Sequence, residues 1–278
     1  KYGIDLRSKS DAQIAEHLVA HLRSGKVRRM IDEAVVIHGY DPISMTWPGN
    51  PAMSLPRYKL DYHGRPKPIR RTIKDGYSFK YQPPAWVSFT SPHLKELLRT
   101  CCSVDFVVRD KEQLVPMWME DDNGELVFDV PKIKTGVQMP PSVRQTVTIG
   151  GVPYQMDIGG LRSKEKNRSV FATDEYTLRT IDVRSYYPSM MIQMRMFPEA
   201  LDEIFLGLFE SIYGERQEAK AAAKTYKERI AAGEDHDGAL KAFLDELVTI
   251  EGGFKIVLNG TFGKLWSKYS IYFAPEHG

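Results

Sequence analysis

Apolar residues recur at helical spacing in the first part of the chain, over residues 8–38. This stretch begins with Ser10 and Asp11, two residue types that cap helix N-termini. The pair Ser24-Gly25 interrupts the pattern, because glycine is unfavourable inside a helix. The pattern therefore predicts a helix up to this pair and a second helical piece over residues 27–37.

The same helical spacing returns near the other end of the sequence. Apolar and basic positions predict one helix over about residues 203–231 and another over about residues 238–258. The short polar stretch Ala232-Gly233-Glu234-Asp235 separates them. Two long helices joined by so short a connection are expected to form an antiparallel helical hairpin, each arm about 30 Å long.

Between the helical parts, the pattern changes to short alternating segments. Ser91-Pro92 is a typical helix start, with serine as cap and proline in the first turn. Turn dipeptides at Asn123-Gly124 and Gly150-Gly151 predict two β-hairpins. The expected strands cover residues 104–109, 114–119, 126–130, 145–149, 152–156 and, as a buried strand, 178–183. Sheet segments followed by long helices favour an α+β fold with a mixed or antiparallel sheet.

Residues 40–87 show neither period. They are rich in proline and glycine and are basic from Arg65 to Lys74. Two interpretations fit this segment: an extended connector packed on a neighbouring domain, or a basic strap beside a phosphate backbone. The connector is the favoured one.

Composition adds little about function. The net charge is +2 and the pI is about 8.4, too mild to indicate nucleic acid by itself. No segment reaches the ~20 apolar residues of a membrane span, so no membrane partner is expected. The adjacent Cys101 and Cys102 are no disulfide framework, and the start Lys1-Tyr2-Gly3 has no signal region and looks like a processed or cut end. A cytoplasmic location follows as the expectation.

The most informative segment begins at Asp182. It follows an apolar run and precedes Ser185-Tyr186-Tyr187-Pro188-Ser189, which is expected to open a helix. A helix start presents amide N–H groups to an anion, so Asp182 could hold Mg²⁺ while these amides face a triphosphate. The flat ring of Tyr187 would then exclude a 2′-hydroxyl. A capped carboxylate at a strand-to-helix turn is the simpler alternative for Asp182 alone.

A second segment strengthens the nucleotide interpretation. Lys255, Asn259 and Phe262 follow one another at helical spacing and share a face. A cation, an amide and an aromatic ring suit the phosphates, the sugar or base edge, and the base plane of a nucleotide. A core helix with one surface-reaching lysine would explain the aliphatic residues of this segment, but not Asn259 or the pair Gly260 and Gly263.

Together these segments resemble motifs of family B DNA polymerases, especially those of phages and related mobile elements. Asp182-x-x-Ser185-Tyr186-Tyr187-Pro188-Ser189 resembles the first palm motif, D-x-x-S-L-Y-P-S. Lys255-x-x-x-Asn259-Gly260-x-Phe262-Gly263 resembles the fingers motif, K-x-x-x-N-S-x-Y-G, with Gly and Phe at the usual Ser and Tyr positions. Ile158-Gly159-Gly160-Leu161 is similar to the Y-x-G-G template-strand motif, with Asp157 at its Tyr position.

The resemblance implies a part of a polymerase right hand. Residues 1–90 would be a helical and proline-rich connector region, and residues 91–200 a sheet-containing region leading into the palm. The fingers would be the helical hairpin 201–263, and residues 264–278 would return toward the palm. The implied activity is DNA-directed DNA synthesis, in which two Mg²⁺ ions assist transfer of a nucleotide to a primer 3′-hydroxyl. Primer–template DNA and deoxynucleoside triphosphates are the expected partners, in a phage-infected or element-bearing host cell.

The resemblance also implies a role for each matching residue. Asp182 and the Val183 carbonyl would bind metal, and Lys255 would act with Asp182 in catalysis. Arg216 and Lys220 match an R-x-x-x-K pair for the triphosphate, whereas the nearby Lys224 and Lys227 fit a solvated helix face. The remaining nucleotide contacts would be Ser185, Tyr186, Tyr187, Asn259 and Phe262. The template or DNA contacts would be Gly159, Gly160, Gly263 and Lys264.

One carboxylate does not suffice for two metal ions. The family's second carboxylate lies in a Y-x-D-T-D-S-like hairpin after the fingers, and no such motif occurs between Ser270 and Gly278. An exonuclease carboxylate set is not found either. The sequence thus leaves open a truncated polymerase, a split polymerase whose second polypeptide supplies the remaining palm and thumb, or a non-catalytic DNA- or nucleotide-binding remnant. Chance motifs in an unrelated structural protein are a further alternative that the order of the motifs disfavours.

Overall fold

The computed structural model describes residues 8–42, 45, 55–109, 113–114, 117–120, 125–129, 132–133, 136–157, 160–167 and 169–277. It divides into two compact units that each combine distant parts of the sequence. Unit 1 contains residues 1–71 and 183–274, and unit 2 contains residues 72–182 and 275–278. The four consecutive regions expected from the sequence stay a prediction. Unit 1 joins the N-terminal helix to the helical hairpin, although the two are far apart in the sequence.

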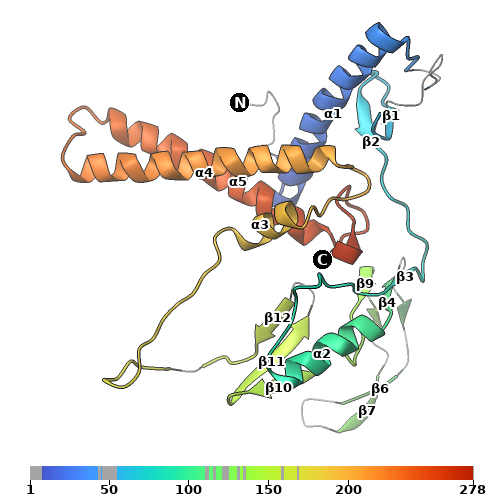
Figure 1. Cartoon of the computed structure of the whole chain (residues 1–278), viewed down its shortest axis with the longest axis vertical. Coiled ribbons are helices and arrows are strands. Elements are labelled where there is room, and N and C mark those ends of the chain that lie inside the picture. Colours follow the sequence, from blue (N-terminus) through green and yellow to red (C-terminus); the bar gives the residue numbers. More distant parts are fainter. Residues whose placement is uncertain are drawn as a thin grey trace. The chain divides into compact units, whose positions relative to one another are not determined.

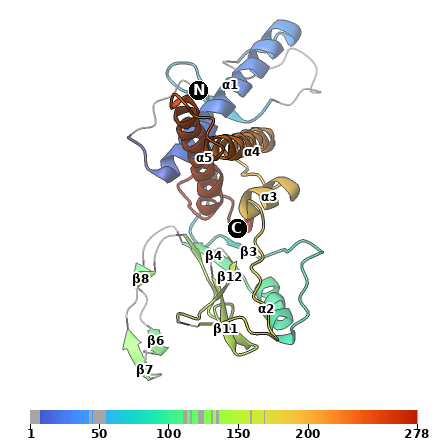
Figure 2. The same ribbon diagram turned by 90° about the vertical axis from the view of Figure 1, so that its left-hand side faces the viewer.

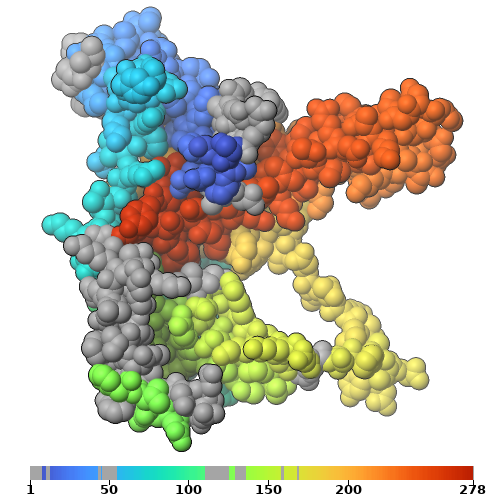
Figure 3. All heavy atoms as spheres, turned by 180° about the vertical axis from the view of Figure 1, so that it is seen from behind, coloured from blue at the N-terminus to red at the C-terminus, as the bar shows by residue number. Residues whose placement is uncertain are grey.

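Unit 1 is built around four helices: α1 (Asp11–His38), α3 (Tyr186–Gln193), α4 (Ile204–Ala231) and α5 (Ala239–Lys264). The long helices α4 and α5 lie antiparallel, which confirms the predicted helical hairpin (Figure 1). With 28 and 26 residues they extend about 42 and 39 Å, longer than expected. Helix α1 packs on α5 (Figure 2), and the connected end of α4 and α5 projects away from α1 (Figure 3).

The core of unit 1 explains why α1 is one continuous helix. Leu18 and Val19 lie before the predicted break and pack into a cluster with residues of α3, α4 and α5, such as Phe209. Val27 and Ile31 lie after it and are buried in a second cluster. Glycine in a helix costs about 1 kcal/mol. Burying one leucine, valine or isoleucine side chain contributes about 1.5–3 kcal/mol, so the two clusters outweigh this cost. The prediction of a break at Ser24-Gly25 was therefore wrong.

A small antiparallel hairpin, β1 (Tyr58–Leu60) and β2 (Pro66–Pro68), packs on the second half of α1. The buried hydroxyl groups of Tyr40 and Tyr58 hydrogen-bond each other at 2.8 Å beneath it. Within unit 2, the two-residue strand β3 (Ser78–Phe79) also falls in the stretch that was expected to be irregular. The prediction of irregular chain for residues 40–87 was thus wrong at these strands, because prolines at strand ends and edges leave the short ladders intact.

Unit 2 contains one helix, α2 (Pro92–Ser103), and several small antiparallel sheets. Ser91 precedes α2 and Pro92 begins it, as predicted. One sheet has the order β3-β4-β9 and another β10-β11-β12, while β5 pairs with β8 and β6 with β7. These strands are β4 (Phe106–Arg109), β5 (Gln113–Leu114), β6 (Met117–Glu120), β7 (Leu126–Asp129), β8 (Lys132–Ile133), β9 (Gly136–Gln138), β10 (Thr146–Ile149), β11 (Val152–Asp157) and β12 (Gly160–Ser163).

Both predicted β-hairpins are present in unit 2. Strands β6 and β7 pair antiparallel, although Asn123-Gly124 lies outside the described residues. Strands β10 and β11 pair in register, with Ile149 opposite Val152. Gly150 and Gly151 between them have φ of 58° and 77°, the left-handed conformations that a tight type I′ hairpin turn requires.

The predicted buried strand over residues 178–183 is absent. Ile181 is 92% exposed, and Leu178 and Val183 are more than half exposed. Residues 164–167 and 169–183 run as irregular chain (Figure 1). An apolar run becomes a strand only where a neighbouring strand pairs with its backbone. Among the described strands, none pairs with residues 178–183. The prediction that Asp182 ends a buried strand was therefore wrong.

The described elements make the chain a mixed α+β protein with five α-helices and small antiparallel sheets, as expected for the fold class. Among the described residues, no helix combines the length and apolar character that crossing a membrane would require.

Candidate functional site

The two motif segments, 73 positions apart at Asp182 and Lys255, meet inside unit 1 through an aromatic pair. Tyr187 lies in the first turn of α3 and Phe262 in the last turns of α5. Their ring centroids are 4.2 Å apart and the ring planes differ by 23°, which is a stacked arrangement. Phe262 is buried, and Tyr187 is half-buried against the same core cluster. The contact fixes the start of α3 beside the C-terminal end of the hairpin.

The turn that leads into α3 has a constrained backbone. Ser185 precedes the helix with φ 49° and ψ 51°, the left-handed conformation that few non-glycine residues adopt. Its hydroxyl group lies 3.1 Å from Nη1 of Arg216 and 3.4 Å from Nε2 of Gln217, both on α4. Arg184 donates hydrogen bonds from Nε and Nη2 to Oε1 of Gln217. Side chains of α4 therefore hold the N-terminus of α3 in place.

Arg216 is engaged within the protein. Its guanidinium group is buried, and its Nε and Nη2 atoms lie 2.8 and 2.6 Å from Oε1 of Glu251 on α5. Because a third nitrogen donates to Ser185, Arg216 links α3, α4 and α5. The predicted triphosphate contact of Arg216 stays a prediction, and it would require phosphate oxygens to replace Glu251 as acceptors.

The other cation and amide positions face outward. Lys220 on α4 and Lys255 and Asn259 on α5 are exposed. None of the three has a hydrogen bond or ion pair involving its side chain within the described residues. Lys255, Asn259 and Phe262 share a helical face, and Tyr187 of α3 covers that face at Phe262, whereas Lys255 and Asn259 are exposed. The arrangement leaves two lysines and an amide available to a ligand on the hairpin.

Tyr186 extends the aromatic group at the start of α3. Its ring is half exposed and lies 5.4 Å from the ring of Tyr187, with a tilt of 59°. The first turn of a helix leaves its amides without intrahelical acceptors, and here Pro188 removes one of these donors. The amides of Tyr186 and Tyr187 are the remaining donors before Ser189, whose amide bonds the Ser185 carbonyl at 2.9 Å.

The predicted metal ligands lie at a boundary. Asp182 is the last residue of unit 2 before the chain enters unit 1 at Val183, and both residues are exposed. Within the part of the chain that the structure describes, no group of three or more His, Cys, Asp or Glu side chains could hold a metal ion. One carboxylate and one carbonyl fall short of the ligands that two Mg²⁺ ions require, so the described residues do not fit a two-metal centre on their own.

The predicted DNA contacts are distributed over both units. Gly159 lies outside the described residues, and Gly160 begins β12 with φ 118° in unit 2. Gly263 and Lys264 end α5 in unit 1. A Cβ atom added to Gly263 would meet no atom within 4 Å, so packing does not require glycine at this position.

Sequence reasoning missed the acceptors that hold this site together. Glu251 and Gln217 pair with Arg216, Ser185 and Arg184, yet neither belongs to a motif. Glu251 lies one helical turn before Lys255, on the face that points at α4. The four-residue spacing from Glu251 to Lys255 could have placed Glu251 near the predicted site. It does not indicate which charge on the facing helix its carboxylate pairs with.

Comparisons of the chain with models of protein families, with curated proteins and with solved structures find no significant match. The support for a function is therefore the motif residues and their arrangement.

Proposed function

We propose that the chain is the palm-entry and fingers part of a family B-type DNA polymerase, and that the α4–α5 hairpin binds a deoxynucleoside triphosphate. The observation that carries the proposal is the stacking of Tyr187 on Phe262 at 4.2 Å. It joins two segments that independently resemble nucleotide-binding motifs of one family, in the order in which that family has them.

In this proposal the exposed cations receive the phosphates. Lys220 and Lys255 lie on facing helices of one hairpin, so ammonium groups from both sides can neutralise a triphosphate. Asn259, one turn after Lys255, offers an amide to the sugar or base edge. The ring of Tyr187 would lie under the sugar and discriminate against a 2′-hydroxyl, with Phe262 as its support.

Metal chemistry enters the proposal only in part. In DNA synthesis Mg²⁺ would activate the primer hydroxyl and stabilise the leaving pyrophosphate. Asp182 and the Val183 carbonyl would contribute to that centre, and a second carboxylate would have to come from other residues of the polypeptide or from a second polypeptide.

Nucleotide binding is tested by titrating the chain with a mant-labelled deoxynucleoside triphosphate. Lys255→Ala is expected to weaken binding about 10- to 100-fold, since a hydrogen bond to a charged group contributes about 1.5–3 kcal/mol. Lys241→Ala is the matched control, because Lys241 is also exposed on α5 but lies 14 residues, or about 21 Å, from Lys255. Equal affinities of the two variants would contradict the proposal.

Catalysis is tested by primer extension with this chain and with a version that continues further downstream. Asp182→Ala should abolish any extension, and extension that survives this change would exclude the assignment. Tyr187→Val should increase incorporation of ribonucleotides relative to deoxynucleotides. An unchanged ratio would remove the sugar-selection role from Tyr187 while leaving the rest of the proposal.

A second candidate is a nucleotide- or DNA-binding protein without turnover. Asp182 is exposed and belongs to no group of three or more His, Cys, Asp or Glu side chains that could hold a metal ion among the described residues, which favours this candidate. Lysine-dependent triphosphate binding combined with no extension by either the chain or its longer version would support this candidate.

A further inference from the structure

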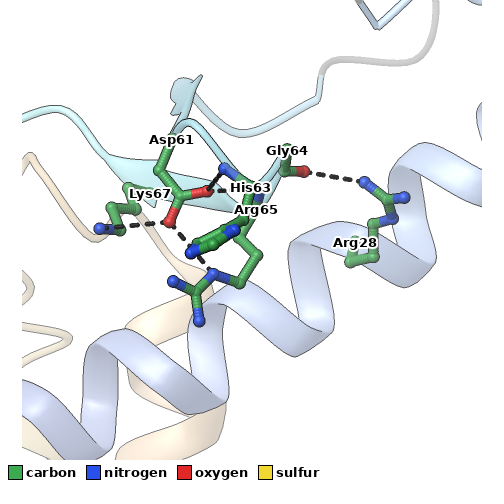
Figure 4. A network of polar contacts seen from close by, with 6 residues as sticks. All are labelled: Arg28, Asp61, His63, Gly64, Arg65 and Lys67. Atoms are coloured by element: carbon green, nitrogen blue, oxygen red, sulfur yellow. Dashed lines mark hydrogen bonds and ion pairs between the residues drawn. The ribbon is translucent and has the colours of Figure 1, made fainter.

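The turn of the β1–β2 hairpin is fixed by one carboxylate (Figure 4). Asp61 accepts hydrogen bonds from the amides of His63 and Arg65, at 3.0 and 2.9 Å. Its second oxygen lies 3.1 Å from Nε of Arg65 and 3.2 Å from Nζ of Lys67. Arg28 on α1 donates to the carbonyl of Gly64 at 3.0 Å. The turn is therefore held in one conformation although it is on the surface.

The two strands have an apolar side toward α1 and a basic side toward solvent. Tyr58, Pro66 and Pro68 are buried. Lys59 and Lys67 are exposed and are direct cross-strand partners, so both side chains stand on the outer face. Like charges directly opposite each other destabilise a strand pair. Lys67 also pairs with Asp61 in the turn, but Lys59 has no such contact among the described residues, so strand pairing does not account for two lysines facing each other here.

Positive charge is concentrated here far beyond the average of the chain. Residues 57–71 contain six Arg or Lys residues and one carboxylate, whereas the whole chain has a net charge of +2. Asp61 binds Arg65 and Lys67, while Glu199 faces Arg57 and Arg71 at 3.4 Å. On α1, Asp32 pairs with Arg28. Within the described residues, Lys59 and Arg70 have no carboxylate partner.

An aromatic pair stands at the tip of the same hairpin. Tyr62 is 91% exposed, and its ring centroid lies 3.7 Å from that of His63, which is also exposed. An exposed tyrosine in the turn of a basic hairpin suits unstacked bases, because any base can stack on a flat ring while lysines contact the phosphates. Bases inside a duplex are already stacked and do not offer this face.

We propose that the outer face of the β1–β2 hairpin binds single-stranded nucleic acid, with Lys59 and Lys67 on phosphates and Tyr62 stacked on a base. The inference deepens the proposed function, which supplies DNA as the expected partner. The site is separate from the α4–α5 nucleotide site, so the two can fail independently.

The test is fluorescence anisotropy of labelled oligo-dT with the full chain at several NaCl concentrations. Lys59→Gln/Lys67→Gln should weaken binding about 20-fold near 0.1 M salt and lower the slope of log affinity against log salt by about 1.4, or about 0.7 per lost phosphate contact. Lys59→Arg/Lys67→Arg should bind like the parent chain. Lys95→Gln/Arg99→Gln removes two exposed cations from α2 and should leave the affinity unchanged. An unchanged affinity and slope in the hairpin Gln variant overturns the proposal.

The stacking contact has its own test. Tyr62→Ala should weaken binding of oligo-dT at least fivefold, corresponding to the low end of base–aromatic stacking, and should leave binding of a labelled duplex unchanged. Circular dichroism of this exposed variant verifies folding. Equal affinity of Tyr62→Ala and the parent chain for oligo-dT overturns the assignment to single strands.

Two other outcomes also overturn the proposal. Lysines on an exposed strand edge can serve to prevent self-association, in which case the Gln variant dimerises while its oligo-dT affinity stays unchanged. Binding to phosphatidylserine vesicles in place of oligo-dT would identify an anionic lipid surface. If the chain does not bind mant-nucleotide but binds oligo-dT through the β1–β2 hairpin, the α4–α5 nucleotide site is refuted and the hairpin site is supported. If it binds mant-nucleotide but its oligo-dT binding does not depend on the hairpin, the hairpin site is refuted and the nucleotide site is supported.

Discussion

A buried ion pair connects the N-terminal helix to the start of α4, and its removal should destabilise unit 1. Arg23 on α1 is fully buried, and its Nη2 lies 2.6 Å from Oδ2 of Asp202, whose side chain is 29% exposed. The guanidinium also donates to the carbonyls of Leu201 and Arg57, at 3.3 and 2.9 Å. Its Nη1 has no partner in the described structure, so Asp202 is the only anion balancing the charge there.

Asp202→Asn isolates the charge from the other roles of this residue. Asp202 has φ 49°, and asparagine is among the residues that tolerate this conformation. Oδ1 accepts a hydrogen bond from the amide of Ile204 at 3.1 Å, which the asparagine oxygen can retain. Removing one partner of a buried pair costs about 3–5 kcal/mol, and the partial exposure of Asp202 reduces this to about 2–3 kcal/mol.

Urea unfolding followed by far-UV circular dichroism measures this change. Among the described α-helices only α2 lies outside unit 1, so the helical signal reports mainly on that unit. Glu199→Gln is the matched control, because the carboxylate of Glu199 is itself exposed and its two ion pairs are long, at 3.4 Å, so the change should alter stability by less than about 0.5 kcal/mol. Equal losses in the two variants would refute the reasoning. In a cycle with Arg23→Met, the double variant should lose at least about 1 kcal/mol less than the sum of the single losses.

Three further predictions concern single residues. Glu251→Gln should release Arg216, because the Glu251 carboxylate no longer competes with phosphate for its guanidinium group. We expect the affinity for mant-labelled triphosphate to rise about fivefold, which corresponds to about 1 kcal/mol, and an equal or lower affinity would contradict this. Burial raises the pKa of Cys101 to about 11, so N-ethylmaleimide at about pH 8 should modify Cys102 first, as peptide mass spectrometry would show; faster modification of Cys101 refutes it. The hydrogen bond from the Arg65 amide holds the pKa of Asp61 well below its usual range. The Asp61 carboxylate therefore stabilises the fold fully above its unfolded-state pKa of about 4. This contribution is lost as the pH falls through the lower folded-state pKa. In Asp61→Asn the decrease of melting temperature in acid should be shallower, and parallel curves would contradict it.

The sequence predicted those elements whose signals are local. The helical hairpin, the start of α2 at Ser91-Pro92 and the hairpin at Gly150-Gly151 each depend on residues close in the chain, and each is present. The expected break at Gly25 and the strand over 178–183 were wrong for the same physical reason. Both depend on partners distant in sequence: a core that compensates the glycine, and a neighbouring strand that is not among the described residues.

The candidate site shows the same division. The spacing of Lys255, Asn259 and Phe262 correctly places them on one face of a helix. It does not reveal that Tyr187 covers this face at one end and leaves the other end exposed. Periodicity gives the direction of a side chain, whereas its burial depends on which other element packs there.

The two kinds of cation in unit 1 have different physical uses. Arg23 and Arg216 are buried, and each donates several hydrogen bonds to acceptors on other elements. A guanidinium group suits this position because it is weakly hydrated and has five donors in a fixed plane. Lys59 and Lys255 are exposed and without carboxylate partners in the described structure. Their ammonium groups can bind phosphate without first losing an internal acceptor. Substituting these lysines should therefore change ligand affinity at nearly constant stability, and substituting the arginines should reduce stability first.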